Sequence, residues 1–372
     1  MASIYIHIPF CKQACHYCNF HFSTQLNYTQ QMTDAICKEV SMRHHELGSS
    51  VLNSIYLGGG TPSILSLSQL DQLFNSVTKY FTLSPDAEIT IEANPDDITA
   101  EKLNYFKESP INRFSLGVQS FFAEDLKWMN RAHNEGDAEG AIRAIKEKGF
   151  ELITIDLIYG TPTLSLDKWE QNLKKVLELD LEHISAYCLT VEENTALAKF
   201  IDKGKVTAPD DAHAAEQFSF LVKFMEEHGF EQYEISNFAK NQRYAKHNTA
   251  YWQNKPYLGV GPSAHSFNGT QRGWNIANNQ RYIKSIELNQ LPYEFEVLTP
   301  KNRINEYIMT GLRTQWGCDW NYIQQQFGDE LTTQLKQKVT QKSAQIENTP
   351  QYFKLNKQAR LYADGIAADL FF

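Results

Sequence analysis

Long hydrophobic runs, a signal-peptide pattern and an excess of basic charge are all missing from this sequence of 372 residues. No apolar run approaches the roughly 20 residues that a membrane-spanning helix needs, so we expect no membrane span. The N-terminal segment lacks the basic region and long apolar core of a signal peptide, which predicts a cytoplasmic protein. The chain has 44 acidic against 35 basic residues and a net charge of −9. It therefore lacks the excess of positive charge that is typical of nucleic-acid-binding proteins, and we expect no such partner.

Cysteine is also scarce, with only six residues. In a chain without a secretory signal, cysteines indicate metal or redox chemistry rather than disulfides. Cys37, Cys188 and Cys318 stand alone, and a lone cysteine is most simply a small buried hydrophobic residue. The other three cysteines are clustered near the N-terminus, and they carry the strongest chemical signal in the chain.

Cys11, Cys15 and Cys18 are separated by steps of four and three residues, so that three thiolates can converge from one loop on a metal centre. A four-iron cluster usually takes four protein ligands, and three ligands leave one iron open for a small molecule. The alternative is a structural zinc site, for which three histidines could supply the fourth ligand: His7, His16 and His21. Zinc sites usually place ligand pairs on two separate knuckles, and no second pair follows here. The spacing therefore favours an iron–sulfur cluster over zinc.

Short β-rich runs alternate with amphipathic helical stretches over the first half of the chain. We predict strands at 3–8, 51–57, 88–93, 113–118, 151–158 and 183–190. This alternation predicts an α/β fold whose parallel sheet is covered by helices and is closed, or nearly closed, into a barrel. From about residue 210 the alternation of strands and helices ends. After residue 298 helices dominate, with a small hairpin that suggests a winged-helix-like module.

Distinctive short motifs follow the predicted strands, at the end of a barrel where reactive groups normally lie. A glycine turn, Gly-Gly-Gly-Thr-Pro at 58–62, follows the second strand, while Glu92, Gln119 and Asp156 end or follow the next three. A carboxylate inside a strand is costly to bury unless it is partnered, so each could be salt-bridged or could bind an amine or ribose hydroxyls. Arg131 has the positive charge and the parallel N–H donors that hold a carboxylate. Together these residues predict one ligand-binding face.

The run His-Asn-Thr-Ala-Tyr-Trp at 247–252 combines a histidine with two aromatic side chains. His247 could ligate haem iron, with Tyr251 and Trp252 stacking on the macrocycle. From the spacing alone, a partly buried aromatic loop is the simpler interpretation. The residues by themselves leave both possibilities open.

Five motifs occur in a fixed order: Cys-x3-Cys-x2-Cys, Gly-Gly-Gly-Thr-Pro, Ile-Glu-Ala-Asn-Pro, Leu-Gly-Val-Gln-Ser and Ile-Asp-Leu-Ile-Tyr-Gly-Thr-Pro. With them the chain resembles the radical S-adenosylmethionine (SAM) superfamily and, within it, the group of oxygen-independent coproporphyrinogen III oxidase and the haem chaperone HemW. The similarity extends over essentially the whole chain. It implies a partial (βα)6 TIM-like barrel with a C-terminal helical, winged-helix-like domain.

The resemblance implies that Cys11, Cys15 and Cys18 hold three irons of a [4Fe–4S] cluster, whose fourth iron chelates the amino and carboxylate groups of SAM. An electron from a donor such as a flavodoxin or ferredoxin would then break the S–C5′ bond and yield a 5′-deoxyadenosyl radical. The positions that look like SAM contacts are Tyr5, Tyr17, Gly59, Gly60, Thr61, Glu92, Gln119, Arg131 and Asp156. The oxidase holds two SAM molecules, so some of these positions could belong to a second site.

Two departures from the oxidase pattern favour the chaperone. Phe20 stands where the oxidase has a fourth cysteine, and the N-terminal extension that precedes the oxidase segment is absent before Tyr5. The run 247–252 matches the His-Asn-x-x-Tyr-Trp haem-binding motif of the chaperone family, which implies haem contacts from His247, Tyr251 and Trp252. The resemblance therefore predicts a protein that binds haem and passes it to haem-accepting proteins. The alternatives are oxidative decarboxylation of coproporphyrinogen III and a zinc-stabilised barrel without a redox role.

The expected domain organisation follows from the same comparison. Residues 1–210 form the core barrel, and residues 211–297 extend the barrel and contain the haem-binding region. Residues 298–372 form the C-terminal winged-helix-like domain.

Overall fold

Six parallel strands form the centre of the molecule and bring the predicted motifs together. In the computed structural model, which describes residues 2–372, they are β1 (Ser3–Ile8), β2 (Val51–Gly59), β3 (Thr82–Ala93), β4 (Arg113–Gln119), β5 (Leu152–Tyr159) and β6 (His183–Cys188). They pair in chain order, each parallel to the next. The six predicted strands are confirmed, although β3 begins earlier and β6 ends earlier than the sequence pattern indicates.

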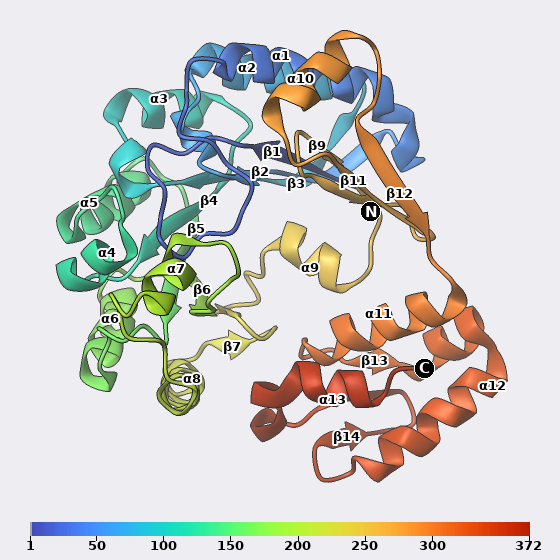
Figure 1. Cartoon of the computed structure of the whole chain (residues 1–372). Coiled ribbons are helices and arrows are strands. Elements are labelled where there is room, and N and C mark those ends of the chain that lie inside the picture. The colour runs from blue at the N-terminus through green and yellow to red at the C-terminus, as the bar shows by residue number, and fades with distance from the viewer. Residues whose placement is uncertain (1) are drawn as a thin grey trace.

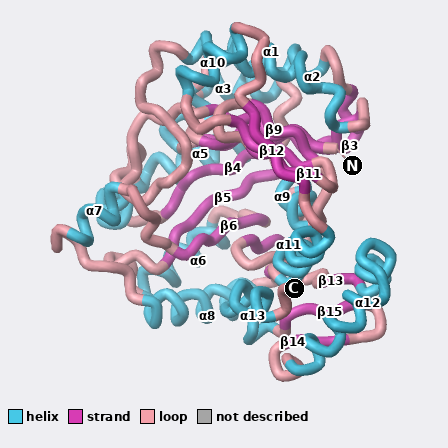
Figure 2. Tube along the Cα trace, turned by 45° about the vertical axis from the view of Figure 1, so that its right-hand side comes forward, coloured by secondary structure: helices cyan, strands magenta, loops and turns pink. Residues whose placement is uncertain are grey.

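The sheet continues beyond both ends of this parallel core and does not close. β9 (Tyr257–Val260) pairs parallel to β1, and β10 (His265–Phe267), β11 (Gln271–Asn275) and β12 (Tyr293–Val297) continue it with antiparallel pairing. At the other end, β8 (Asn237–Ala239) and β7 (Glu231–Gln232) are added next to β6. The described chain thus forms one 12-stranded sheet with β12 and β7 as its edges, and β4, β5 and β6 lie side by side in Figure 2. The result is a partial barrel, as the resemblance implies.

Helices cover the outside of the parallel strands (Figure 1). They are α1 (Thr29–Arg43), α2 (Leu67–Thr78), α3 (Ala100–Glu108), α4 (Ala123–Met129), α5 (Glu135–Glu147) and α6 (Leu166–Glu178). Their sequences specify their ends, because Ser66 and Asn134 form capping boxes at the starts of α2 and α5. Helical spacing then turns one apolar face inward, as α6 shows by burying Trp169, Leu173 and Val176.

Strict alternation along the strands separates the core from the inside of the barrel. On β4, Phe114 and Leu116 are fully buried in the main hydrophobic core, whereas Arg113, Ser115 and Gly117 line the interior. The other interior positions of the six strands are also mostly polar: Tyr5, Tyr56, Thr90, Glu92, Thr154, Asp156, Ser185 and Tyr187. A complete TIM barrel fills its centre with layers of bulky branched side chains. Here polar side chains leave a cavity instead.

The remaining segments extend the barrel and form a second unit. Four helices follow β6 before the C-terminal unit: α7 (Ala196–Asp202), α8 (Asp211–Glu227), α9 (Lys246–Trp252) and α10 (Asn279–Glu287). The C-terminal unit contains α11 (Pro300–Leu312), β13 (Cys318–Asp319), α12 (Trp320–Gln341), β14 (Ile346–Asn348), β15 (Tyr352–Leu355) and α13 (Ala363–Asp369). Short 3-10 helices span His44–Leu47, Pro62–Ile64, Pro95–Asp97 and Lys357–Tyr362.

The C-terminal unit has its own hydrophobic core, separate from that of the barrel, and its three strands form a small sheet. Over residues 2–372, none of the helices has the length and apolar character needed to cross a bilayer.

Candidate functional site

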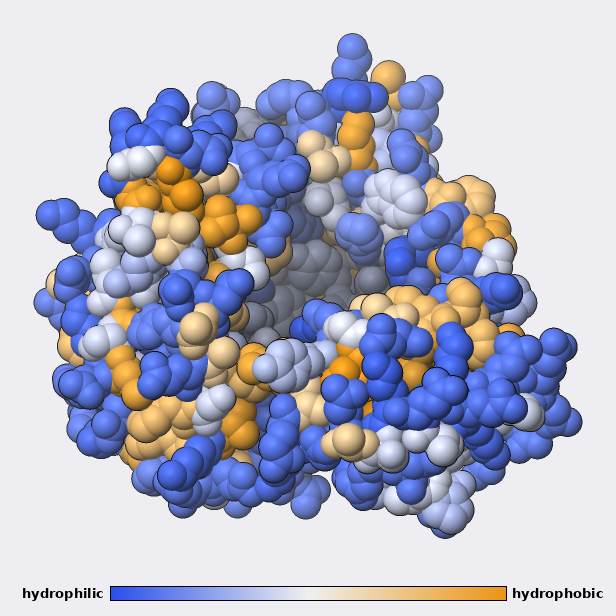
Figure 3. Space-filling view, turned by 60° about the horizontal axis from the view of Figure 1, so that its bottom comes forward, coloured by the Kyte–Doolittle hydropathy of each residue, from blue (hydrophilic) through white to orange (hydrophobic). Residues whose placement is uncertain are grey.

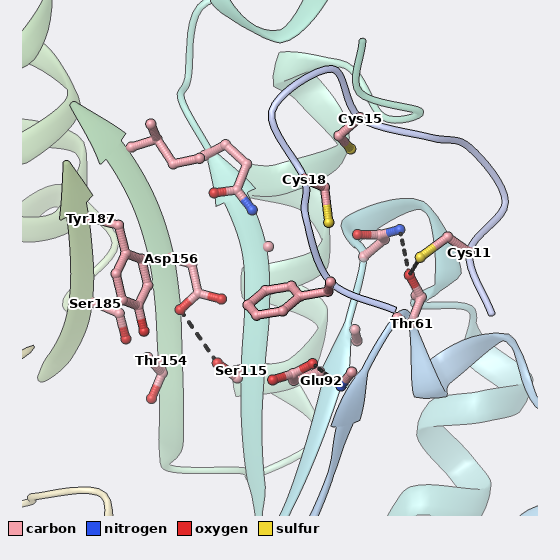
Figure 4. A pocket seen from close by; sticks show the side chains of 18 of the residues that line it. Cys11, Cys15, Cys18, Thr61, Glu92, Ser115, Thr154, Asp156, Ser185 and Tyr187 are labelled. Atoms are coloured by element: carbon pink, nitrogen blue, oxygen red, sulfur yellow. Dashed lines mark hydrogen bonds between the residues drawn. The ribbon is translucent and has the colours of Figure 1, made fainter. Parts of the chain in front are cut away.

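A cavity of about 540 Å³ occupies the inside of the partial barrel. Figure 4 shows the three cysteines on one side of it, Thr154 on the opposite side, and Glu92 and Asp156 between them. We call the side at Cys11, Cys15 and Cys18 the cysteine end. The side at Arg113, Thr154, His183 and Asn248, next to α9, is called the deep end. The space-filling view shows the molecule deeply hollowed near its centre (Figure 3).

The cysteine loop leaves the end of β1 and is closed at its base by backbone contacts. Phe10 and Ser23 form an isolated bridge, and the Cys11 N–H donates to the Ser23 carbonyl at 3.0 Å. The loop therefore returns to its starting point and presents its thiols to the cavity. Burial raises the pKa of the Cys11 thiol to about 12 and raises that of Cys18 as well.

Donors aim at two of the three sulfur atoms. The Thr61 hydroxyl donates to Cys11 Sγ at 3.6 Å, and Arg131 Nη1 donates to Cys15 Sγ at 3.4 Å. Donors of this kind stabilise negative charge on sulfur, which is the form that binds a metal. The donor set thus fits a cluster held by three thiolates.

The geometry does not support the zinc alternative. Among residues 2–372, no three His, Cys, Asp or Glu side chains converge closely enough to hold a single metal ion. Of the candidate fourth ligands, His7 has both ring nitrogens hydrogen-bonded, to the Tyr5 hydroxyl and the His21 carbonyl. His16 and His21 each use one nitrogen, toward the Trp128 carbonyl and Asn279. A four-iron cluster takes one thiolate per iron, so its ligands need not meet at one point.

The glycine turn after β2 passes so close to β1 that side chains would not fit. The Thr61 N–H donates to the Phe10 carbonyl at 2.7 Å. A Cβ on Gly60 would lie 2.4 Å from that oxygen, and one on Gly59, where φ is 109°, would lie 2.6 Å from the His7 ring. Glycine is required here so that the turn can bring Thr61 to the cysteine loop.

Two carboxylates face the middle of the cavity without an ion-pair partner in the described chain. The Tyr56 hydroxyl donates to Glu92 Oε1 at 2.7 Å, and the Gly59 N–H donates to Oε2 at 3.0 Å. Burial, helped by the nearby Asp156 charge, raises the pKa of Glu92 to about 7. Burial likewise raises the pKa of Asp156 to about 6, and the Ser115 hydroxyl donates to it at 3.5 Å. A cationic ligand would supply the ion-pair partner that both groups lack, and a ligand hydroxyl would donate to their remaining lone pairs.

Gln119 and Arg131 complete the cysteine end. Gln119 is buried and holds a φ of 67°, a left-handed conformation that non-glycine residues adopt at a cost and that is frequent at functional sites. Arg131 Nη2 donates to Asn94 Oδ1 at 2.6 Å and to the Gly117 carbonyl at 2.8 Å. Its Nε has no partner although it is buried, so the guanidinium keeps an unused donor.

All predicted cluster and SAM positions line this one cavity, Tyr5 and Tyr17 included. The predicted haem residues are only partly brought together, because His247 and Tyr251 line the cavity and Trp252 does not. The guanidinium of Arg313, from the C-terminal unit, lies 5.3 Å from the centre of the Trp252 ring.

Both nitrogens of His247 are engaged. Nδ1 is 2.8 Å from Ser54 Oγ, Nε2 is 2.8 Å from the Tyr251 hydroxyl, and the Tyr56 ring stacks on the imidazole. Burial lowers the pKa of His247 to about 3, so the ring is neutral, as a metal ligand must be. For Nε2 to bind iron, Tyr251 has to release it.

Sequence reasoning missed most of the cavity lining in the middle of the barrel and at its deep end. The missed residues include Tyr56, Thr90, Arg113, Ser115, Thr154, His183, Ser185 and Tyr187. Their signal was the period-two alternation of polar and apolar residues within each strand, where a parallel strand covered on both faces would be apolar throughout.

Comparison with known proteins agrees with this architecture. The radical SAM superfamily profile matches residues 5–176, and the HemN C-terminal domain profile matches residues 298–362. The fold superposes on coproporphyrinogen III oxidase (HemN) from Escherichia coli with a TM-score of 0.85, covering 100% of this chain and 90% of that one, at 23% identity. The fold and the site thus define a radical SAM protein with a HemN-type C-terminal domain.

Two bacterial relatives are more similar in sequence. The chain is 37% identical to the haem chaperone HemW of Bacillus subtilis, covering 89% of this chain and 88% of that protein. It is 33% identical to HemW of Lactococcus lactis, covering 95% and 94%. The chain belongs to the HemW family.

Proposed function

We propose that this protein is a haem chaperone that binds haem and transfers it to haem-dependent acceptor proteins. One observation carries the proposal: a single cavity contains the three thiols at one end and His247 and Tyr251 near the other. The names of the relatives in Bacillus subtilis and Lactococcus lactis support it.

Under this proposal the cysteine end holds a [4Fe–4S] cluster through Cys11, Cys15 and Cys18, with SAM beside it. Such a cluster, when reduced, supplies the electron for cleavage of SAM. Glu92 and Asp156 have carboxylate oxygens that can accept further hydrogen bonds from the amino group and the ribose hydroxyls of SAM, and Arg131 has a spare donor for the SAM carboxylate. A flavodoxin or ferredoxin would be the electron donor if SAM is cleaved.

Haem would enter the same cavity and be ligated by His247 once Tyr251 releases Nε2. Tyr251 would then contact the macrocycle, while Trp252 would act from outside the cavity, where it contacts Arg313. Phe20, which stands in place of the oxidase cysteine, lies at the cavity and is 68% exposed. An apolar ring there provides contact area for a macrocycle and no further ligand for a metal.

A haem titration and an oxidase assay on one anaerobically reconstituted sample test the proposal. We expect a brown protein with about four irons per chain, since one cubane requires them. We expect haem binding seen by absorbance, and no protoporphyrinogen from coproporphyrinogen III with SAM and reductant. Formation of product would establish the oxidase alternative. A colourless protein with one zinc would establish the zinc-stabilised barrel.

The histidine is tested by His247→Ala, which we expect to weaken haem binding and remove the spectral signature of histidine ligation. His45→Ala, at an exposed position outside the cavity, is the matched control and should bind haem as the unchanged protein does. Unchanged haem binding by His247→Ala would place the iron ligand elsewhere.

A further inference from the structure

The cavity has two positive side chains, and they lie at opposite ends. Among its lining residues in the described chain, Arg113 and Arg131 are the only lysines or arginines. Arg131 contacts Cys15 and the Gly117 carbonyl at the cysteine end. Arg113 begins β4, and the four residue-to-residue steps from it to Gly117 span about 13 Å of strand. Arg113 is ion-paired with Glu88, whereas its remaining N–H donors are left for a second ligand, because the proposed SAM site uses Arg131.

Arg113 is only partly used by the protein itself. It is almost fully buried, its Nη2 donates to Thr154 Oγ1 at 2.8 Å, and its Nη1 is a long 3.4 Å from Glu88 Oε2. Glu88 is satisfied mainly by the start of α9, because the N–H groups of Lys246 and His247 each donate to it at 3.0 Å. A guanidinium has five N–H donors, so Arg113 retains donors beyond these two contacts.

Two further polar atoms of the deep-end lining have no partner in the structure. His183 is buried, and its Nε2 is 2.8 Å from the Tyr233 hydroxyl, while its Nδ1 has no hydrogen bond. Burial and the charge of Arg113 lower the pKa of His183 well below its usual value, so the ring is neutral. Thr90 Oγ1 is also buried and unpaired. Buried polar groups without partners are rare, so these two, beside a partly used guanidinium, leave hydrogen-bonding capacity for a further partner.

We propose that Arg113, His183 and Thr90, at the deep end of the cavity, form a binding site for a carboxylate of the protein's second ligand. A carboxylate can accept several hydrogen bonds at once and pairs with a guanidinium more strongly than neutral acceptors do. This inference rests on the proposed function, under which the ligand is haem and the carboxylate is one of its propionates. The site would orient the macrocycle, with its propionate toward β4 and its iron toward His247.

The test compares ligands that differ only in whether their two propionates are free or esterified. The full-length protein, reconstituted with cluster and SAM, is titrated with haem, haem dimethyl ester, protoporphyrin and protoporphyrin dimethyl ester. We expect each free acid to bind at least about tenfold more tightly than its ester, the value of one charge-assisted hydrogen bond. The iron-free pair measures the carboxylate site without any contribution from iron ligation.

The variants assign the preference to Arg113. The double variant Glu88→Gln/Arg113→Gln removes both charges of the buried pair, so that neither is left unpaired, and the amide oxygen introduced on β3 can still accept from α9. We expect it to bind acid and ester equally, with the histidine-ligation spectrum of bound haem retained. Arg113→Lys, which keeps the charge, should retain part of the preference. Arg143→Gln, an exposed arginine on α5, is the matched control and should retain all of it.

The outcomes separate this inference from the proposed function. Equal binding of acid and ester by the unchanged protein, or a preference that survives in a folded double variant, would overturn the carboxylate site and leave haem binding intact. Absence of binding by all four ligands would overturn both. Circular dichroism and iron content establish that each variant is folded and loaded.

Discussion

The two faces of the parallel sheet differ in the polarity of their side chains as sharply as the surface and the core of an ordinary protein do. The outward positions of β4 are Phe114 and Leu116, both fully buried under helices, whereas the inward positions include Arg113 and Ser115. Adjacent residues of one strand therefore serve separate purposes. The outward face supplies the burial that holds the fold together, and the inward face supplies the hydrogen-bonding groups of a cavity.

The register of the strands makes the inward face a continuous surface. Glu92 on β3 lies opposite Ser115 on β4, which lies opposite Thr154 on β5, which in turn lies opposite His183 on β6. One polar row thus crosses four strands from a proposed SAM residue to the deep end. Substitutions on the two faces are expected to affect different properties, and four predictions test this, beginning with the largest effect.

The largest effect is expected at the cysteine end. Cys15→Ser should abolish the cluster, because the loop supplies only three thiolates and the proposed cluster uses all of them. Iron content and visible absorbance should then fall to background. The thermal unfolding of the apo protein should change little, since the loop lies outside the main core. Cys37→Ser, at a cysteine that does not line the cavity, is the control. A variant that keeps its four irons would contradict the ligand assignment.

Outward substitutions should mainly affect stability. Leu116→Ala should lower the free energy of unfolding by about 2–5 kcal/mol, because it leaves a cavity in a close-packed core. Its neighbour Ser115→Ala, on the inward face, should lower it by no more than about 1 kcal/mol. Denaturant titration of the two apo variants measures the contrast. Equal losses would mean that the inward face also stabilises the fold.

The proposed SAM site should depend on pH through Glu92. Its pKa is raised to about 7 by burial, so the carboxylate is largely ionised at pH 8 and largely protonated at pH 6. An ionised carboxylate attracts the amino group of SAM, so we expect SAM affinity, measured by calorimetry, to fall as the pH is lowered across this range. Glu92→Gln should bind more weakly and lose this dependence, whereas the exposed Glu178→Gln should retain it. A flat pH profile in the unchanged protein would remove Glu92 from the site.

The smallest effect is expected on stability through Asp156. Burial raises its folded pKa from 3.8 to about 6, so between these values the folded state binds more protons than the unfolded state. The free energy of unfolding of the SAM-free protein should therefore fall as the pH rises through this window. Asp156→Asn should reduce that slope when stability is measured from pH 4 to 7. An unchanged slope would show that Asp156 titrates normally in the fold.

Much of the architecture was predictable from local pattern. The six strands and the glycine turn follow from periodicity and from residues with special backbone freedom, which act over a few neighbouring positions. The positions of Cys11, Glu92 and Asp156 at one cavity followed from the rule that the carboxyl ends of parallel strands meet. The early start of β3 was not predicted, because its first residues include a proline and charged groups that are atypical of strands.

The deep end was not predictable, because its residues come from distant parts of the chain. Arg113, His183 and Thr90 are brought together by strand register, and α9 is placed by contacts between Glu88 and the N–H groups of Lys246 and His247. No local pattern specifies such long-range pairing. The same is true of Trp252, whose motif suggests one site and whose position lies outside it.

The sequence by itself therefore determined the family, the parallel core and the cysteine end, since each depends on residues close together in the chain. Only the tertiary structure decided that the barrel is hollow, that Tyr251 engages His247 Nε2 and that Arg113 lies opposite the cysteines. The physical reason is that these features depend on which buried polar groups satisfy one another. That pairing is settled when the strands and α9 come together in three dimensions.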